Sequence, residues 1–290
     1  ELLLSSKPYS AVVFDEFVEV KMDGPNGDET VHCKLLCGAD GAHSWVRRNF
    51  RMGNPRETMI GFQIEVTGYN GDSGMLDMYT GKNIAPGFFS WAIPTGDTTR
   101  VGTWTKSELM NGLSSEQYLD RMLQDQKINS RFEQCSEVAR FCGPVPSGVV
   151  RKPLIERVAL FGDSAGVCKP TTGGGIGPGF KQVDLLVPRL SKCMENNELS
   201  RGTMKSISAL LKEMARNQRK KRALRDAFLT EMSDYELEKI FDVWARPEVT
   251  DLINEFGDIE NPIPLGIKML REVPEFRRLA GRAAKAVLWG

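Results

Sequence analysis

Residues 157–180, RVALFGDSAGVCKPTTGGGIGPGF, limit the possible folds more than any other part of the chain. The apolar run 158–161 has the composition of a buried parallel strand. The run stops at Gly162 and Asp163, and a Pro-Thr-Thr-Gly-Gly-Gly loop leads into a segment that can start a helix. This order of strand, acidic residue, glycine loop and helix start predicts an α/β architecture around the segment.

The same segment has the chemical groups of a cofactor site. A carboxylate such as Asp163 accepts hydrogen bonds from sugar-like hydroxyls, and glycines let backbone N–H groups come close to a ligand. The N-terminus of the following helix favours negative charge. The pattern therefore predicts a site for a phosphorylated or polyhydroxylated cofactor. The alternative is a tight strand-to-helix turn without a ligand.

Length, charge and cysteine content exclude several classes of protein. The 290 residues are enough for a large core and two lobes, and the formal net charge of zero gives no case for nucleic acid. No apolar run approaches the roughly 18 residues that a membrane span requires. The six cysteines form no CxxC pair and only two histidines occur, so we expect no metal site, no Ser-His-Asp triad and reduced thiols in a cytoplasmic protein.

A second strand also ends in an Asp-Gly pair. The strand-like residues 35–37 lead into Gly38, Asp40 and Gly41, and a helix start follows. An Asp-Gly pair alone is common in turns. Two such strand ends, about 120 residues apart, are far more specific for a cofactor site.

The remaining chain divides into a strand-rich and a helical part. We expect strands at 11–14, 18–22 and 30–36, and then a run of short strands that predicts an antiparallel sheet covering a pocket, at 59–67, 74–79, 87–94 and 99–105. Capping boxes at 114–117 and 233–236 open two helices. Further helices are expected at 175–196, with Pro188 kinking or ending it, and at 201–230.

Three motifs carry a resemblance to a known family. Residues 38–48, GADGAHSWVRR, resemble the internal Asp-Gly motif of flavoprotein hydroxylases and geranylgeranyl reductases, and residues 161–176, FGDSAGVCKPTTGGGI, are similar to the second FAD motif in its geranylgeranyl reductase form. Residues 86–94, PGFFSWAIP, resemble the family's substrate motif, with Phe89 in place of tyrosine and Ile93 in place of phenylalanine. The tail from Leu237 to Ile259, with Pro274, resembles the family's helical C-terminus.

The resemblance implies a mixed α/β fold, α+β overall, with three parts. A partial FAD-binding Rossmann-like domain of the aromatic-hydroxylase type would comprise residues 1–53 and 143–196. An antiparallel-sheet substrate domain would comprise 54–142, and a C-terminal helical region 197–290. The family begins with a strand–GxGxxG–helix unit, which is absent here, so we expect that the chain begins inside a longer, N-terminally truncated protein.

The resemblance also implies roles for individual residues. Asp163 would bind the ribityl hydroxyls, the N–H groups of 174–176 would face the pyrimidine edge of the flavin, and Pro170 would shape the loop. Asp40 would sit near the pyrophosphate, and Arg47 is either a phosphate partner or a solvated helix cation. The full set of expected FAD-binding residues is Asp40, Gly41, Arg47, Gly162, Asp163, Pro170, Gly173, Gly174, Gly175 and Ile176.

The expected substrate wall lies on the strand at 87–94. Phe88, Phe89, Trp91 and Pro94 would line it, with Phe89 and Trp91 on one face. An isoprenoid chain offers little but apolar surface, so aromatic walls suit it; the alternative is ordinary sheet core. Cys168 is read as a small core residue, with a proton donor or redox partner as the other option. The sequence identifies no catalytic residue.

The resemblance implies an FAD-dependent oxidoreductase that saturates C=C bonds of geranylgeranyl or other prenyl chains. The substrate would be a membrane ether lipid or geranylgeranyl diphosphate, and the electron donor a ferredoxin, NAD(P)H or a deazaflavin. The alternatives are an FAD-dependent aromatic hydroxylase and a non-catalytic fragment that binds a prenyl lipid. The basic segment 271–289 would either pack on the body or dock on a membrane surface.

Overall fold

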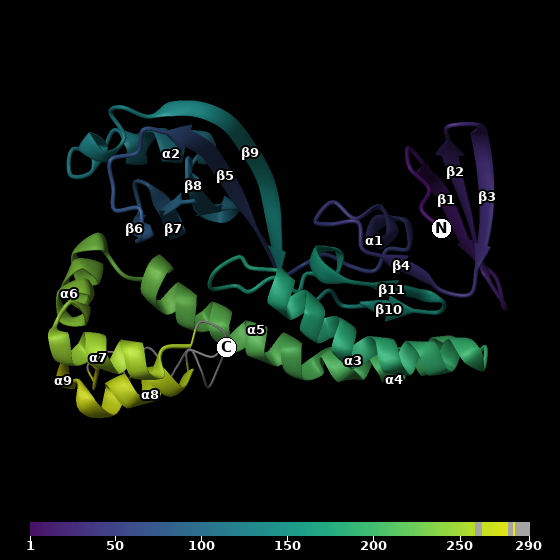
Figure 1. The fold of residues 1–290 in the computed structure, drawn as a ribbon. Helices are drawn as coiled ribbons and strands as arrows, with labels where there is room; N and C mark the ends of the chain where they lie inside the picture. Colours follow the sequence, from purple (N-terminus) through teal and green to yellow (C-terminus); the bar gives the residue numbers. More distant parts are fainter. Residues whose placement is uncertain (259–262, 278–280, 282–290) are drawn as a thin grey trace. The chain divides into compact units, whose positions relative to one another are not determined.

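The computed structural model describes residues 1–258, 263–277 and 281. The chain forms two compact units, each built from two segments. The first unit comprises Glu1–Met59 and Pro144–Gln218, and the second comprises Ile60–Gly143 and Arg219–Gly290. Figure 1 traces the elements along the chain. Among the described residues, every helix is too short or too polar to cross a bilayer.

The first unit begins with a three-stranded antiparallel meander. Its strands, in spatial order, are β1 (Lys7–Val13), β2 (Val18–Gly24) and β3 (Gly27–Cys33). The pairing of Gly24 with Gly27 closes a tight turn of sequence Gly-Pro-Asn-Gly. Alternation along β2 buries Val18 and Val20, which form a small core with Ala11 of β1.

A second small sheet in this unit contains the two strands that lead into the motifs at Asp40 and at Asp163. Its strands are β10 (Leu154–Ile155), β11 (Val158–Leu160) and β4 (Leu36–Gly38), in that spatial order. Strand β11 is fully buried and runs parallel to β4, as its apolar sequence predicts. Gly38 permits close packing, since a Cβ there would lie 2.8 Å from side-chain atoms of Leu160 and Val46.

The helices of the first unit begin with the short α1 (Trp45–Asn49), whose first turn is capped by the Ser44 hydroxyl. The long α3 (Ile176–Glu195) follows the glycine loop and continues through Pro188, so the proline does not end it. Residues 201–230 are helical throughout, as predicted, but the geometry changes along the segment: α4 (Arg201–Ser208), a 3-10 turn (Ala209–Leu211), α5 (Lys212–Arg225) and a π-helical turn (Asp226–Thr230) follow one another without a gap. The segment passes from the first unit to the second after Gln218. Helices α3 and α4 pack apolar side chains against β10 and β11 in one core: Leu186, Leu190, Leu199, Met204, Ile207, Leu154 and Ala159.

The second unit contains a five-stranded sheet. Its strands, in spatial order, are β6 (Asp77–Gly81), β7 (Ala85–Pro94), β8 (Thr99–Lys106), β5 (Glu57–Thr67) and β9 (Ser136–Ser147). The β6–β7 and β7–β8 pairs are antiparallel, as expected. Strands β5 and β9 each cross the boundary between the two units.

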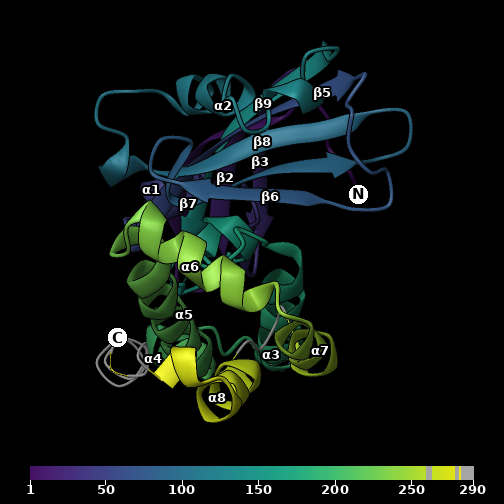
Figure 2. The ribbon, with the colours of Figure 1, turned by 90° about the vertical axis from the view of Figure 1, so that its left-hand side faces the viewer.

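Helix α2 (Ser115–Leu123) covers one face of this sheet (Figure 2), and the predicted capping box of Ser114 and Gln117 is present. Leu119 and Met122 pack there against Phe62, Ile64 and Val101. This buried layer accounts for the alternating apolar residues of β5 and β8.

A helical subdomain completes the second unit. It contains α6 (Asp234–Trp244), α7 (Pro247–Phe256), α8 (Ile263–Glu272) and α9 (Pro274–Arg277). The Ser233–Glu236 capping box opens α6 as predicted. Most of the basic segment 271–289 lies outside the described residues, and so does Ile259.

Candidate functional site

The two Asp-Gly motifs meet at one edge of the small sheet in the first unit. Gly38 and Leu160 pair at the ends of the parallel strands β4 and β11, and Asp40 and Gly162 each lie two residues beyond the end of their strand. Carboxyl ends of neighbouring parallel strands share an edge, and that edge is where α/β sheets bind ligands. The structure therefore brings together two motifs that are about 120 residues apart in sequence.

Asp40 builds the loop after β4. Its Oδ2 accepts a hydrogen bond from the backbone N–H of Val46, 3.0 Å away, and so ties the loop to α1. Gly41 has φ +72°, a conformation that residues with a Cβ rarely adopt. These contacts give Asp40 a local structural role in shaping the turn that presents Arg47.

Arg47 is buried between the two motifs, with 7% of its surface exposed. Its guanidinium donates to the carbonyl oxygen of Ser164 at 2.9 Å and to that of Ala42 at 2.6 Å. Its Nε has no hydrogen-bond partner, and no carboxylate among the described residues forms an ion pair with it. Burial lowers the pKa of Arg47, and the charge of Asp40 opposes this effect. A solvated helix cation is therefore the wrong reading of Arg47.

Asp163 lies in the 3-10 turn Gly162–Ala165, which begins where β11 ends. Gly162 has φ +62°, and its N–H donates to Oε1 of the fully buried Gln182 at 2.9 Å. Nε2 of Gln182 in turn donates to the carbonyl of Leu160, so α3 fixes the end of the strand. Oδ1 of Asp163 accepts a hydrogen bond from Sγ of Cys168 at 3.0 Å.

The glycine loop folds back on itself before α3. The N–H of Lys169 donates to the carbonyl of Gly174, and the N–H of Gly173, at φ +73°, donates to the carbonyl of Lys169, both at 2.9 Å. Pro170 is buried and Gly173, Gly174 and Gly175 are half-buried. Gly175 is the N-cap of α3 and provides no side-chain hydrogen bond to its first turn. Ile176, the first residue of α3, is 78% exposed.

These groups fit a flavin nucleotide. The unpartnered Nε and positive charge of Arg47 suit a phosphate group. The Oδ2 of Asp163, which accepts no hydrogen bond from any described residue, suits a hydroxyl. The uncapped first turn of α3 supplies N–H groups and a positive dipole end, which favour electron-rich or anionic edges.

The predicted aromatic wall lies in the second unit on β7. The ring of Phe89 stacks on Phe88 with centroids 4.8 Å apart and meets Trp91 edge-on at 6.1 Å. Trp91 and Phe88 are buried, and Pro94 ends the strand and is half-buried. Phe89 and Trp91 thus contact each other, as the strand period predicts.

Sequence reasoning missed Trp104, which extends this array. Its ring centroid lies 5.2 Å from that of Trp91, and Gly102 of β8 pairs with Trp91 in the sheet. Glycines make room for both indoles: a Cβ on Gly61 would lie 2.1 Å from Trp104, and one on Gly102 would lie 2.4 Å from Trp91. The sequence did contain a signal for Trp104: the segments 87–94 and 99–105 were predicted as consecutive antiparallel strands, which lie side by side and bring Trp104 near Trp91.

A buried cation also contacts the aromatic array and was missed. The guanidinium of Arg225 lies 5.4 Å from the ring centroid of Phe88 and pairs with Asp226 at 2.7 Å. Lys106 of β8 reaches the same carboxylate at 3.3 Å. The array is therefore bordered by a charge network within the second unit.

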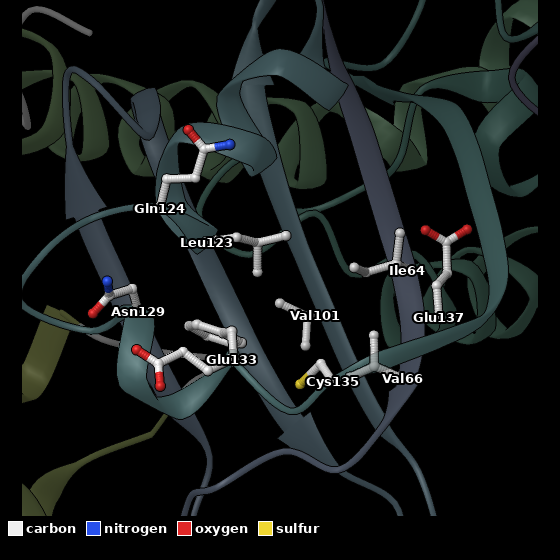
Figure 3. A pocket seen from close by; sticks show the side chains of 10 residues that line it. Ile64, Val66, Val101, Leu123, Gln124, Asn129, Glu133, Cys135 and Glu137 are labelled. Carbon is white, nitrogen blue, oxygen red and sulfur yellow. The ribbon is translucent and has the colours of Figure 1, made fainter.

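The sheet also lines a pocket of about 500 Å³ in the second unit, shown in Figure 3. Its floor is apolar, with Ile64, Val66, Val101 and Leu123, and the carboxylates of Glu133 and Glu137 stand at its edge. None of the aromatic residues expected to bind substrate lines this pocket. It is a second feature, separate from the aromatic array.

Comparison with known proteins identifies the fold. A family model described as "FAD binding domain" matches residues 15–197, and the chain belongs to this family. FAD, the cofactor expected from the sequence, is thereby confirmed. A solved structure of a geranylgeranyl bacteriochlorophyll reductase-like protein from Thermoplasma acidophilum superposes with a TM-score of 0.79 at 20% identity, over 96% of this chain and 69% of that protein.

Curated relatives confirm the resemblance to geranylgeranyl reductases. A digeranylgeranylglycerophospholipid reductase of Methanocaldococcus jannaschii is 26% identical over 74% of this chain and 56% of its own length. A chloroplastic geranylgeranyl diphosphate reductase of Nicotiana tabacum is 30% identical over 54% of this chain and 33% of its own length. The chain thus spans about half or less of the length of these relatives.

Proposed function

We propose that this member of the FAD-binding family takes part in the FAD-dependent saturation of C=C bonds in geranylgeranyl or other prenyl chains. The observation that carries the proposal is the convergence of Asp163, Arg47 and the uncapped start of α3 at one sheet edge. The names of the relatives support the choice of reductase chemistry. In this proposal residues 1–53 and 143–196 form the FAD-binding domain, 54–142 the substrate domain and 197–290 a helical region.

Each group at the sheet edge has a proposed role toward FAD. Asp163 would accept a hydrogen bond from the ribityl chain through Oδ2, and Arg47 would lie toward the pyrophosphate. The N–H groups of residues 174–176 would face the pyrimidine edge, where the α3 dipole favours negative charge. Asp40 would act through the loop that it holds against Val46. When bound, FAD supplies the two-electron hydride chemistry that alkene reduction requires.

The aromatic array on β7 and β8 would provide an apolar wall for the prenyl chain. Phe88, Phe89 and Trp91 present ring surface, and Trp104 extends it beyond the motif. Such a wall excludes water and binds by area, which suits a ligand that has almost no polar groups. Pro94 would end the strand at the edge of the wall.

We base a proposal for the substrate on the names of the relatives. The M. jannaschii relative is named for a glycerophospholipid and the tobacco relative for a diphosphate, so we propose a geranylgeranyl ether lipid or geranylgeranyl diphosphate as the substrate. The two electrons would come from a ferredoxin, NAD(P)H or a deazaflavin. We further propose a cytoplasmic location with peripheral contact to the membrane that contains the lipid.

The test uses the full-length protein, loaded with FAD and reduced chemically without oxygen. With a geranylgeranyl ether lipid or geranylgeranyl diphosphate, we expect mass spectrometry to show a gain of two hydrogen atoms for each double bond reduced. No mass gain with either substrate would contradict the proposal. A gain of one oxygen atom from an aromatic compound, in air with NAD(P)H, would instead identify a hydroxylase. Prenyl-lipid binding without turnover would identify a binding protein.

A further inference from the structure

We propose that Cys168 is a positioning residue that holds the Asp163 carboxylate in place for the cofactor. This inference rests on the proposed function, in which Asp163 binds the ribityl chain. The Sγ of Cys168 donates a hydrogen bond to Oδ1 of Asp163 at 3.0 Å. Among the described residues, no other group donates a hydrogen bond to that carboxylate. The thiol thereby fixes one carboxylate oxygen and directs the other toward the ligand.

The thiol is suited to remain a donor. Cys168 is 2% exposed, and burial together with the neighbouring Asp163 carboxylate raises its pKa. A raised thiol pKa keeps the proton on sulfur at neutral pH, so the S–H group can donate. A thiolate at this position would instead repel Asp163.

The backbone of Cys168 is held independently of its side chain. Its carbonyl oxygen accepts hydrogen bonds from Oγ of Ser147 and from Nε2 of Gln218, both at 3.0 Å. Gln218 is buried and also donates to the carbonyl of Gly166. A substitution that removes only the thiol therefore leaves these backbone contacts in place.

Gly175 closes the arrangement from the side of α3. A Cβ at this position would lie 2.9 Å from Oδ1 of Asp163 and 3.2 Å from Sγ of Cys168. A side chain at the N-cap of α3 would therefore collide with both the carboxylate and the thiol, and glycine leaves their arrangement undisturbed. Rotation of the carboxylate away from Cys168 would give up the thiol bond and move Oδ2 from its present direction.

The experiment compares Cys168→Ala, which removes the donor, with Cys168→Ser, which keeps one, in the full-length protein stripped of FAD and then titrated with FAD. Cys33→Ala is the matched control, because Cys33 is a half-buried thiol of the same unit that donates to the carbonyl of Val18. We expect Cys168→Ala to weaken FAD binding on the order of tenfold, because a hydrogen bond to a charged group is lost. Cys168→Ser should recover most of the affinity, and Cys33→Ala should leave it unchanged.

Infrared spectroscopy provides a readout that a purely structural role would not move. The S–H stretching band of Cys168, isolated as the difference between wild type and Cys168→Ala, should shift when FAD binds, because Asp163 then shares its charge with a second donor. Full affinity in Cys168→Ala, a Cys168→Ser variant as weak as Cys168→Ala, or an unshifted band would overturn the inference. Asp163→Asn separates it from the proposed function: full FAD binding in that variant would reject the Asp163 assignment itself.

Discussion

Arg47 is a buried cation whose hydrogen-bond acceptors are carbonyl oxygens and not carboxylates. It bridges the loop after β4 and the turn after β11 through Ala42 and Ser164. The charge of Asp40 acts on Arg47 but forms no ion pair with it. A buried charge that is hydrogen-bonded only to neutral acceptors is costly, and its cost falls when an anion binds beside it. In the proposed function Arg47 would therefore have two roles, since the contacts that shape the apoprotein also hold a positive charge where we propose that a phosphate lies.

The two roles of Arg47 separate in a pair of substitutions. Arg47→Lys keeps the charge but cannot span both carbonyls, so we expect it to lower the free energy of unfolding by about 1–3 kcal/mol. Arg47→Met loses charge and hydrogen bonds, so it should bind FAD more weakly than Arg47→Lys does. Urea unfolding of the apoprotein measures the first effect, and fluorescence titration with FAD measures the second.

Arg48→Met is the matched control for Arg47, because Arg48 is the exposed neighbour on the same helix. It should change neither quantity by more than about 0.5 kcal/mol. Equal FAD affinities for Arg47→Lys and Arg47→Met would show that the charge of Arg47 does not act on the cofactor.

At the scale of single residues, the sequence predicts the position of a site residue when its neighbours in the chain form a recognisable pattern. Asp40 and Asp163 each follow a strand and adjoin a glycine, so short patterns identify their loops. The burial of Arg47 was not predictable in this way, because it depends on Ser164, more than a hundred residues away. The contact of Cys168 with Asp163 also depends on the folded loop, and small-core packing was the favoured reading of that thiol from sequence.

At the scale of elements, glycines in β5 and β8 allow two indoles to lie against the sheet. We predict that Gly102→Ala lowers the free energy of unfolding by about 1–3 kcal/mol, because its Cβ would lie 2.4 Å from Trp91 and 2.9 Å from the carbonyl of Phe62. Near-ultraviolet circular dichroism should change as well, since the indole moves. Denaturant unfolding measures the stability.

Gly143→Ala is the control for Gly102, because Gly143 lies on β9 of the same sheet with no atom near its added Cβ. It should leave the near-ultraviolet spectrum unchanged. If Gly102→Ala and Gly143→Ala have the same stability and spectrum, Gly102 is not needed for the packing of Trp91.

Pro188 lies inside α3 and is exposed. Because proline has no N–H, the carbonyl of Asp184 lacks its helical partner. We predict that Pro188→Ala raises the free energy of unfolding by about 1–3 kcal/mol. The greater conformational freedom of alanine in the unfolded chain opposes this gain and makes it smaller than the full difference in helix propensity. Urea unfolding tests this, with Arg189→Ala as the neighbouring exposed control; a Pro188→Ala midpoint at or below wild type would contradict it.

Elements with a strong period were predictable, and interrupted ones were not. Residues 59–67 and 99–105 alternate regularly and form β5 and β8, and both capping boxes mark helix starts. Strand β9 was missed because Pro144 and Pro146 weaken its pattern, which an edge strand tolerates. Residues 201–230 were correctly predicted as helical, but the changes from α to 3-10 and π geometry within them coincide with no proline or glycine after Gly202, so no sequence signal indicates these changes.

At the scale of the whole molecule, each unit contains a weakly acidic side chain, a thiol in one and a phenol in the other, whose protonated form is stabilised by folding. In the first unit, burial and Asp163 raise the pKa of the Cys168 thiol. In the second unit, burial and a hydrogen bond to Asp77 raise the pKa of Tyr69, whose hydroxyl donates to that carboxylate. Arg131 pairs with the same carboxylate at 2.5 Å and keeps it ionised.

These shifts predict that the protein loses stability at alkaline pH. In the unfolded chain the thiol ionises near pH 8.5 and the phenol near pH 10, whereas the folded protein keeps both protons. The unfolded state then binds fewer protons than the native state, so the free energy of unfolding falls as pH rises. We expect a flat melting temperature between pH 7 and about 8, followed by a decline that steepens near pH 10, measured by circular dichroism.

Tyr69→Phe and Cys168→Ala measure how much of the decline these two groups contribute, beside the half-buried or exposed thiols of Cys33, Cys37 and Cys135, whose pKa values burial also raises. Tyr69→Phe should melt at a lower temperature near pH 7, because Asp77 loses a donor, but its melting temperature should fall less steeply than that of wild type above about pH 9. Cys168→Ala should flatten the earlier part of the decline, above about pH 8. The expected sign follows from proton binding alone, so a melting temperature that rises between pH 8 and 10, or slopes identical in wild type and both variants, would show that these two groups do not stabilise the fold through their protonated forms.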